Sequence, residues 1–288
     1  MSLPPTPIPD PESLIEPAPA LIQASAATSI EPIILPPPKP RFPAWSYWDV
    51  LAVLVFTVVC IFVFSVIALF IAKTQPGYHN LSIAELTAKV ATNAQVIVGA
   101  QAAAYLFVLA FIYMLVRTRA RQPFAPAIQW NWPGPWVPAF VAGGIVLALV
   151  IDGMSRFLPI PKSLPMDNFF NDATSAYMMA AFGVTLAPLL EELFFRGLLY
   201  PLLRRTFGLV VGVLLTALAF AGIHGAQLGY AWAPILSIFV VGVVFTVVRH
   251  RLNSVAASFL MHCGYNFTLF AMLWIATDHF RHLEKAAG

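Results

Sequence analysis

Six residues between positions 191 and 266 have side chains that could together hydrolyse an amide bond. They are Glu191, Glu192, Arg196, His224, His262 and Asn266. A carboxylate and an imidazole can hold a water molecule and take its proton, while a second imidazole and an amide can donate hydrogen bonds to the oxyanion that forms when this water attacks a carbonyl. The set therefore predicts hydrolysis by an activated water.

The spacing of these residues gives them different places on a helix. Glu192 and Arg196 are four positions apart, so their side chains share a face and can form an ion pair, whereas Glu191 points about 100° away. We therefore expect Arg196 to neutralise Glu192 and to leave Glu191 available as the base. His262 and Asn266 are also four positions apart and share a face of their own helix.

Two other interpretations fit the same residues. Glu191, His224 and His262 could bind Zn²⁺ as a three-ligand set with one position open for water, although the sequence contains no HExxH motif. Alternatively, the polar side chains could be structural, forming one ion pair and several interhelical hydrogen bonds that hold the helices together. The residue types alone leave all three interpretations open.

The composition places these residues in a membrane protein. Of the 288 residues, 59% are hydrophobic and 10% are charged, and the mean hydropathy is +0.79. Soluble domains have about 45–50% and 25% of these residue classes, so a soluble globular enzyme is excluded. The sequence predicts an all-α fold, a polytopic membrane helix bundle of about seven transmembrane helices. The expected spans are 45–72, 93–116, 136–158, 176–203, 207–224, 231–248 and 254–276.

Three of these spans carry the polar residues to a similar depth in the membrane. Counting about 1.5 Å of rise per residue from one membrane face, Glu191 lies roughly 18 Å deep and His224 about 25 Å deep. On the same basis, His262 lies about 14 Å deep and Asn266 about 20 Å deep. Pro188 lacks a backbone N–H and is expected to kink the fourth span just before Glu191. The polar groups are thus predicted to meet near the middle of the membrane.

The rest of the chain divides into an arm and a membrane domain. Residues 1–43 contain 13 of the 25 prolines and show no sustained helical period, which predicts a disordered, Pro-rich cytoplasmic arm. Residues 44–280 form the expected transmembrane helical domain. The six residues that could hydrolyse an amide bond lie in its segment 176–276. The polar segment 81–89 between the first two spans predicts either a short helix at the membrane interface, which is favoured, or an extended start to the second span.

The basic residues predict the orientation of the helices. Nine Lys and Arg residues flank the spans on the side of the N-terminus and six flank them on the other side. The positive-inside rule then places the N-terminus in the cytoplasm and the C-terminus outside. We expect an integral, multi-pass protein of the cell membrane. Because these cations lie beside apolar spans, the formal net charge of +3 indicates contact with anionic membrane lipids and no nucleic-acid partner.

Three motifs resemble those of a known family. EELFFR at 191–196 fits the pattern EExxxR, FAGIH at 220–224 fits FxxxH, and HCGYN at 262–266 fits HxxxN. In this order the motifs resemble the CPBP family of intramembrane proteases, named for CAAX processing and bacteriocin processing and also called Abi. This family is related to the type II CAAX prenyl endopeptidases. The resemblance covers the last four predicted spans.

The resemblance implies that 44–280 is a protease domain acting on membrane-associated peptide or protein substrates, with prenylated CAAX-like substrates among the candidates. It implies that Glu191 and His224 activate water. In the same mechanism, His262 and Asn266 stabilise the oxyanion. Because the family's glutamate-type mechanism needs no catalytic metal, no cofactor is expected, and zinc held by the three ligands above is the alternative.

Other function classes use the same residues. A non-catalytic membrane adaptor or a bacteriocin-immunity-type protein of the same fold would keep the polar cluster for stability. A proton-coupled carrier would use the carboxylate and the histidines as a relay. The sequence contains a base, a partner for the water and oxyanion donors together, and this favours an enzyme over the adaptor and the carrier. Phe194, Phe195 and Phe220 are expected to face lipid rather than to line a substrate groove.

Overall fold

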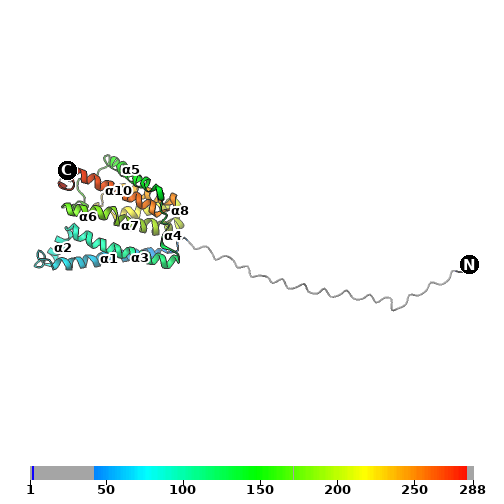
Figure 1. The fold of residues 1–288 in the computed structure, drawn as a ribbon, viewed down its shortest axis with the longest axis horizontal. Coiled ribbons are helices and arrows are strands. Elements are labelled where there is room, and N and C mark those ends of the chain that lie inside the picture. The colour runs from blue at the N-terminus through cyan, green and yellow to red at the C-terminus, as the bar shows by residue number, and fades with distance from the viewer. Residues whose placement is uncertain (1, 3–41, 171, 284–288) are drawn as a thin grey trace, which may run out of the picture. The chain divides into compact units, whose positions relative to one another are not determined.

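The computed structural model describes residue 2, residues 42–170 and residues 172–283, so nearly all of the predicted Pro-rich arm lies outside the described residues. In the described part of the chain every regular element is a helix, which confirms the all-α membrane bundle (Figure 1). The α-helices are α1 (Tyr47–Lys73), α2 (Ile83–Ala91), α3 (Ala94–Ala120), α4 (Phe124–Ile128), α5 (Val137–Ser155), α6 (Ala173–Val184), α7 (Leu186–Glu192), α8 (Tyr200–Ile223), α9 (Trp232–Leu252) and α10 (Val255–Ala276). The other helical segments are the 3-10 helices η2 (Gly134–Trp136) and η3 (Pro165–Phe169) and the π-helical segment η4 (Leu193–Leu199).

Six helical stretches of the described residues are long and apolar enough to cross a membrane. The fourth, Ala173–Ile223, has 51 residues, and a straight helix of that length would measure about 76 Å against a hydrocarbon core of about 30 Å. This stretch therefore contains two crossings, as the predicted spans 176–203 and 207–224 require. The outer ends of all the predicted spans lie within four residues of the observed helix ends.

The reversal between these two crossings occurs at Gly208. Its φ of 79° and ψ of −177° lie in a region that is open essentially to glycine alone. A Cβ added at Gly212 would lie 2.8 Å from the backbone nitrogen of Arg204, whereas eight residues of a straight helix span about 12 Å. The chain thus folds back on itself, and the second half of α8 returns alongside η4.

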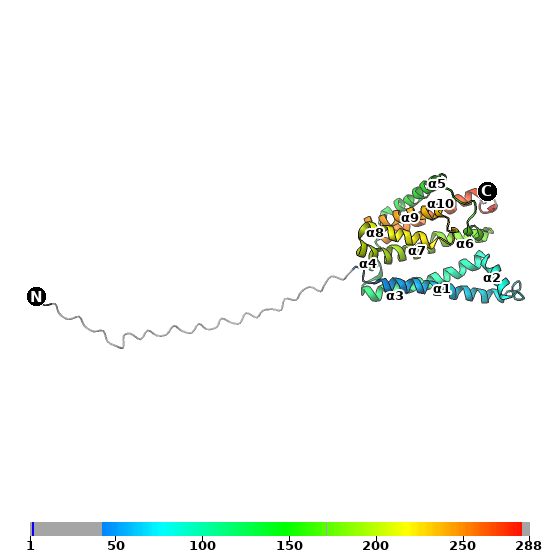
Figure 2. The same ribbon diagram turned by 180° about the vertical axis from the view of Figure 1, so that it is seen from behind.

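The helices are arranged in layers. Figures 1 and 2 show α1 and α3 on one side of the bundle, α5 and α10 on the other, and α6 and α7 between them. The predicted helix at 81–89 is α2, which begins with a capping box between Ser82 and Glu85. The hydrogen bonds from Ser82 hold the pKa of the Glu85 carboxyl below its usual range.

Two glycines bring α5 and α10 into backbone contact. A Cβ on Gly144 of α5 would lie 2.0 Å from the carbonyl oxygen of Met261, and one on Gly264 of α10 would lie 2.3 Å from that of Val141. No side chain fits at either position, so the small residues allow the close approach that is typical of membrane helices. Because Gly264 faces α5, His262, two positions earlier, is turned toward the interior of the bundle.

Candidate active site

A break in the fourth crossing positions the EExxxR motif. Pro188 has no N–H to donate to the carbonyl of Val184, and α6 ends at Val184. The chain restarts as α7 and then widens into the π-helical segment η4, so that the motif spans the junction between the two. The predicted kink before Glu191 is confirmed. Single π-helical turns of this kind occur frequently at functional sites.

The expected ion pair between Glu192 and Arg196 is present and fully buried. Arg196 Nη1 donates to Glu192 Oε1 over 2.9 Å, and both side chains are 0% exposed. The same carboxylate oxygen accepts from His262 Nδ1 at 3.0 Å. Arg196 also donates to the carbonyl of Gly242 and to the hydroxyl of Thr246, both on α9. The two side chains therefore neutralise each other and also connect the α7–η4 segment to α9 and α10 by hydrogen bonds.

Aromatic rings enclose the guanidinium of Arg196. Its central carbon lies 4.3 Å from the ring centroid of Phe220, 5.5 Å from that of Phe245 and 5.9 Å from that of Phe195. Such contacts stabilise a cation that is removed from water. Phe195 and Phe220 are each 2% exposed, so the expectation that they face lipid is wrong. They pack on the buried cation, while Phe194 is half-buried.

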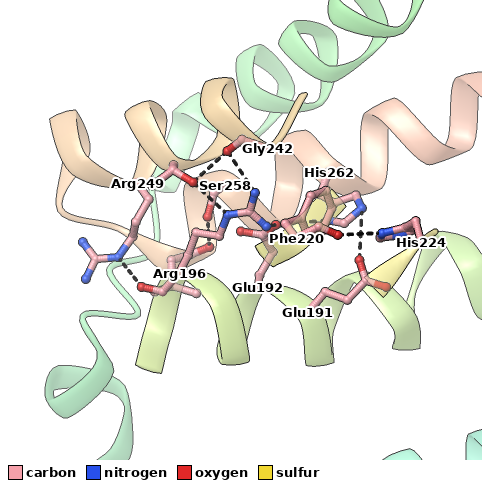
Figure 3. A network of polar contacts seen from close by, with 11 residues as sticks. Glu191, Glu192, Arg196, Phe220, His224, Gly242, Arg249, Ser258 and His262 are labelled. Carbon is pink, nitrogen blue, oxygen red and sulfur yellow. Dashed lines mark hydrogen bonds and ion pairs between the residues drawn. The ribbon is translucent and has the colours of Figure 1, made fainter. Parts of the chain in front are cut away.

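Glu191 and Glu192 approach opposite nitrogens of one imidazole. Glu191 Oε2 lies 3.7 Å from His262 Nε2, and Figure 3 shows its carboxylate pointing toward that ring. Unlike the fully buried Glu192, the Glu191 side chain is 15% exposed. The Glu192 contact fixes a hydrogen on Nδ1, because the ionised carboxylate can only accept. The other nitrogen of His262 is thereby presented to Glu191.

His224 joins this group through Phe220. The Nδ1 atom of His224 donates to the carbonyl of Phe220 over 2.8 Å, which leaves Nε2 as the free nitrogen. The ring of Phe220 lies 5.0 Å from that of His224 and 5.8 Å from that of His262, centroid to centroid. Within the described residues, no hydrogen bond or ion pair joins His224 to Glu191. Of the two histidines, His262 is the direct neighbour of Glu191.

Asn266 lies one turn beyond His262 and bonds to a different helix. Its Nδ2 atom donates to the carbonyl of Gly183 near the end of α6, at 2.6 Å. In the described part of the chain, no hydrogen bond links Asn266 to Glu191 or to either histidine. An amide nitrogen carries two hydrogens, so one donor remains beyond the contact with α6.

The three residues considered as zinc ligands do not form a ligand set. Among the described residues, no three His, Cys, Asp or Glu side chains lie together in a way that could hold a metal ion. Both ring nitrogens of His262 face carboxylates, and one nitrogen of His224 is bonded to the backbone.

Sequence reasoning missed the contribution of α9. Arg249 counted as one of the basic residues flanking the spans, yet it is 2% exposed, and its Nε donates to the carbonyl of Arg196. Gly242 and Thr246 were not singled out either, although both accept from Arg196. Nothing in the sequence distinguishes Arg249 from an exposed arginine such as Arg251, because both lie at the end of an apolar span.

The segment that contains these residues matches a known family. Residues 173–268 match the family described as Type II CAAX prenyl endopeptidase Rce1-like. Residues 173–268, about a third of the chain, are therefore similar to an Rce1-like domain. The match begins at the first residue of α6 and ends within α10, so it contains all three motifs and confirms the resemblance to the CPBP family. No curated protein and no solved structure matches the chain. At the level of the family, this similarity is to a protease-like enzyme.

Proposed function

We propose that this protein is an intramembrane endopeptidase that hydrolyses peptide bonds of membrane-associated substrates, with prenylated CAAX-like peptides as the first class to test. The observation that carries this proposal is the contrast between two adjacent carboxylates. Glu192 is neutralised by Arg196, whereas Glu191 is partly exposed and lies 3.7 Å from an oriented imidazole. A scaffold does not require an unneutralised carboxylate inside the membrane.

In the proposed mechanism, Glu191 and His262 hold the attacking water. A separation of 3.7 Å is too long for a good direct hydrogen bond, but a water can lie about 2.8 Å from both atoms. Glu191 takes a proton as the water oxygen attacks the substrate carbonyl. When the C–N bond breaks, Glu191 returns this proton to the leaving amine. Glu192 and Arg196 keep His262 oriented throughout.

The oxyanion donors in this mechanism are His224 and Asn266. When protonated, His224 donates from Nε2, because Nδ1 is already bonded to Phe220. Asn266 supplies the amide hydrogen that is not bonded to Gly183. This proposal differs from what the family resemblance implied, in which His224 shares the water with Glu191. The 3.7 Å approach of Glu191 to His262 favours His262 in that role.

The direct test is release of peptide fragments from membrane substrates by the purified protein in lipid. A prenylated peptide and its unprenylated counterpart, supplied at equal concentration, would establish whether the lipid group is recognised. Release that requires the intact Glu191 supports the proposal. A folded chain that cleaves none of a broad panel of membrane peptides favours the non-catalytic adaptor.

We propose that the reaction needs no metal cofactor. Active protein should therefore contain far less than one equivalent of zinc, measured by elemental analysis of the purified chain. A variant such as His224→Ala should then lose turnover without any change in metal content. Stoichiometric zinc that disappears together with activity in this variant would establish a metalloprotease instead.

We further propose that the N-terminus is cytoplasmic. Cysteine introduced at Arg251, which follows the buried Arg249, should react with an impermeant thiol reagent only from the cytoplasmic side. Cysteine at Lys162, in the exposed segment after α5, should react only from the opposite side. The native chain controls for labelling of Cys60 and Cys263. The reverse pattern would invert the orientation and place the N-terminus outside.

A further inference from the structure

A basic cavity of about 220 Å³ lies where α8 begins and α9 ends, outside the proposed catalytic group. Three arginines line it, Arg204, Arg205 and Arg249, together with Tyr200 and Gln129. No Asp or Glu is among the described residues of its wall. The volume exceeds what one water molecule occupies. The cavity therefore concentrates positive charge around a space that can hold a polar group.

Arg249 is buried in this wall, and no counter-ion for it lies among the described residues. It donates to the carbonyl of Arg196 and to the side-chain oxygens of Asn253 and Gln129, all of which are uncharged. Figure 3 shows it at the end of the polar network away from His224. Arg196, by contrast, is paired with Glu192. A buried cation with only neutral partners is costly, so an anion in the cavity would compensate it.

Tyr200 provides an independent sign of a missing partner. The residue is 1% exposed, and its hydroxyl has no hydrogen-bond partner among the described residues. A buried hydroxyl without a partner costs free energy that a bound acceptor would recover. Arg204 and Arg205, in contrast, are exposed at the mouth of the cavity. One acceptor could therefore contact a buried hydroxyl and several guanidinium groups.

We propose that this cavity binds a phosphate group, supplied by the headgroup of an anionic phospholipid. Phosphate offers several acceptor oxygens and negative charge, and the planar fork of a guanidinium matches its geometry. The arginines lie at an end of membrane-crossing helices, where phospholipid headgroups are found. Inorganic phosphate shares the same chemistry, and the experiment separates the two sources. The site is independent of the catalytic proposal.

The test measures the unfolding temperature of the full chain. The chain is placed in phosphatidylcholine nanodiscs with or without phosphatidylglycerol, and separately in detergent with or without inorganic phosphate. A ligand that binds the folded state raises the unfolding temperature. The test variant is Arg204→Gln/Arg205→Gln. Its matched control is Arg117→Gln/Arg121→Gln, which removes the same charge from exposed arginines at the end of α3.

We expect phosphatidylglycerol to raise the unfolding temperature of the native chain and of the control, and to have at least about tenfold weaker apparent affinity for the test variant. Tyr200→Phe should leave the ligand-free protein as stable as the native chain and also weaken binding. An equal effect from inorganic phosphate would support the site with free phosphate as its ligand. Equal losses in the test and control variants, or no shift with either probe, would overturn the proposal.

Discussion

Glu191→Gln should slow peptide release by about 10³-fold, within the range of about 10²–10⁴ that proton transfer by a positioned group contributes. The amide keeps the size of the carboxylate but cannot take a proton from water. Because Glu191 forms no ion pair with an arginine or lysine in the described part of the chain, its replacement should leave the folded protein in the membrane. Initial rates of fragment release, with the unfolding temperature measured on the same samples, check both expectations.

Glu85→Gln is the matched control for this substitution. Glu85 is an exposed carboxylate on α2 whose partner is Ser82 of its own capping box, so the change removes one negative charge far from the polar network. Its turnover should equal that of the native chain. If Glu191→Gln retained native turnover while remaining folded, Glu191 could not be the base, and the proton-relay and adaptor interpretations would gain support.

Arg196→Met should destabilise the protein by about 3–5 kcal/mol, the range found when one partner of a buried ion pair is removed. The substitution leaves the Glu192 carboxylate uncompensated at 0% exposure and also removes the hydrogen bonds to Gly242 and Thr246. Reversible unfolding in mixed detergent would measure the loss. Adding Glu192→Gln should restore part of the stability, because the double variant no longer buries an unpaired charge.

The chain contains a matched exposed pair for comparison. Asp152 and Arg156 have the same i,i+4 spacing, with a 3.2 Å contact and side chains that are 33% and 75% exposed. Arg156→Met should change stability by no more than about 1 kcal/mol, as is usual for exposed pairs. Similar losses from the Arg156 and Arg196 variants would show that burial does not set the energetic importance of the Glu192 pair.

The family motifs do not by themselves assign the two histidines to their roles. Either imidazole could share water with Glu191 on the basis of helix depth. The observed contacts separate them, because His262 lies between the two glutamates whereas His224 bonds to the backbone of Phe220. Comparing His224→Gln with His262→Gln would test this division. We expect the second to lower stability as well as turnover, since it removes a partner of the buried Glu192.

The sequence by itself determined the features that depend on one helix at a time. The membrane crossings follow from apolar length, because each must cover about 30 Å of hydrocarbon without exposing backbone polar groups. The Glu192–Arg196 pair follows from four-residue spacing, and the kink at Pro188 follows from a missing N–H. The ordered motifs likewise predicted the family resemblance that residues 173–268 bear out.

Only the tertiary structure decided how side chains on different helices meet. In the folded chain both glutamates lie beside His262, and Asn266 donates to the carbonyl of Gly183. Arg249 is buried and donates to the carbonyl of Arg196. Residue spacing fixes angles within a helix but not the rotation of one helix against another. That rotation depends on packing between helices. Gly264 is an example, because a Cβ there would lie 2.3 Å from the backbone of Val141, so this face of α10 can meet α5 only without a side chain. Such contacts join residues from about 50 to more than 100 positions apart, which no local pattern records.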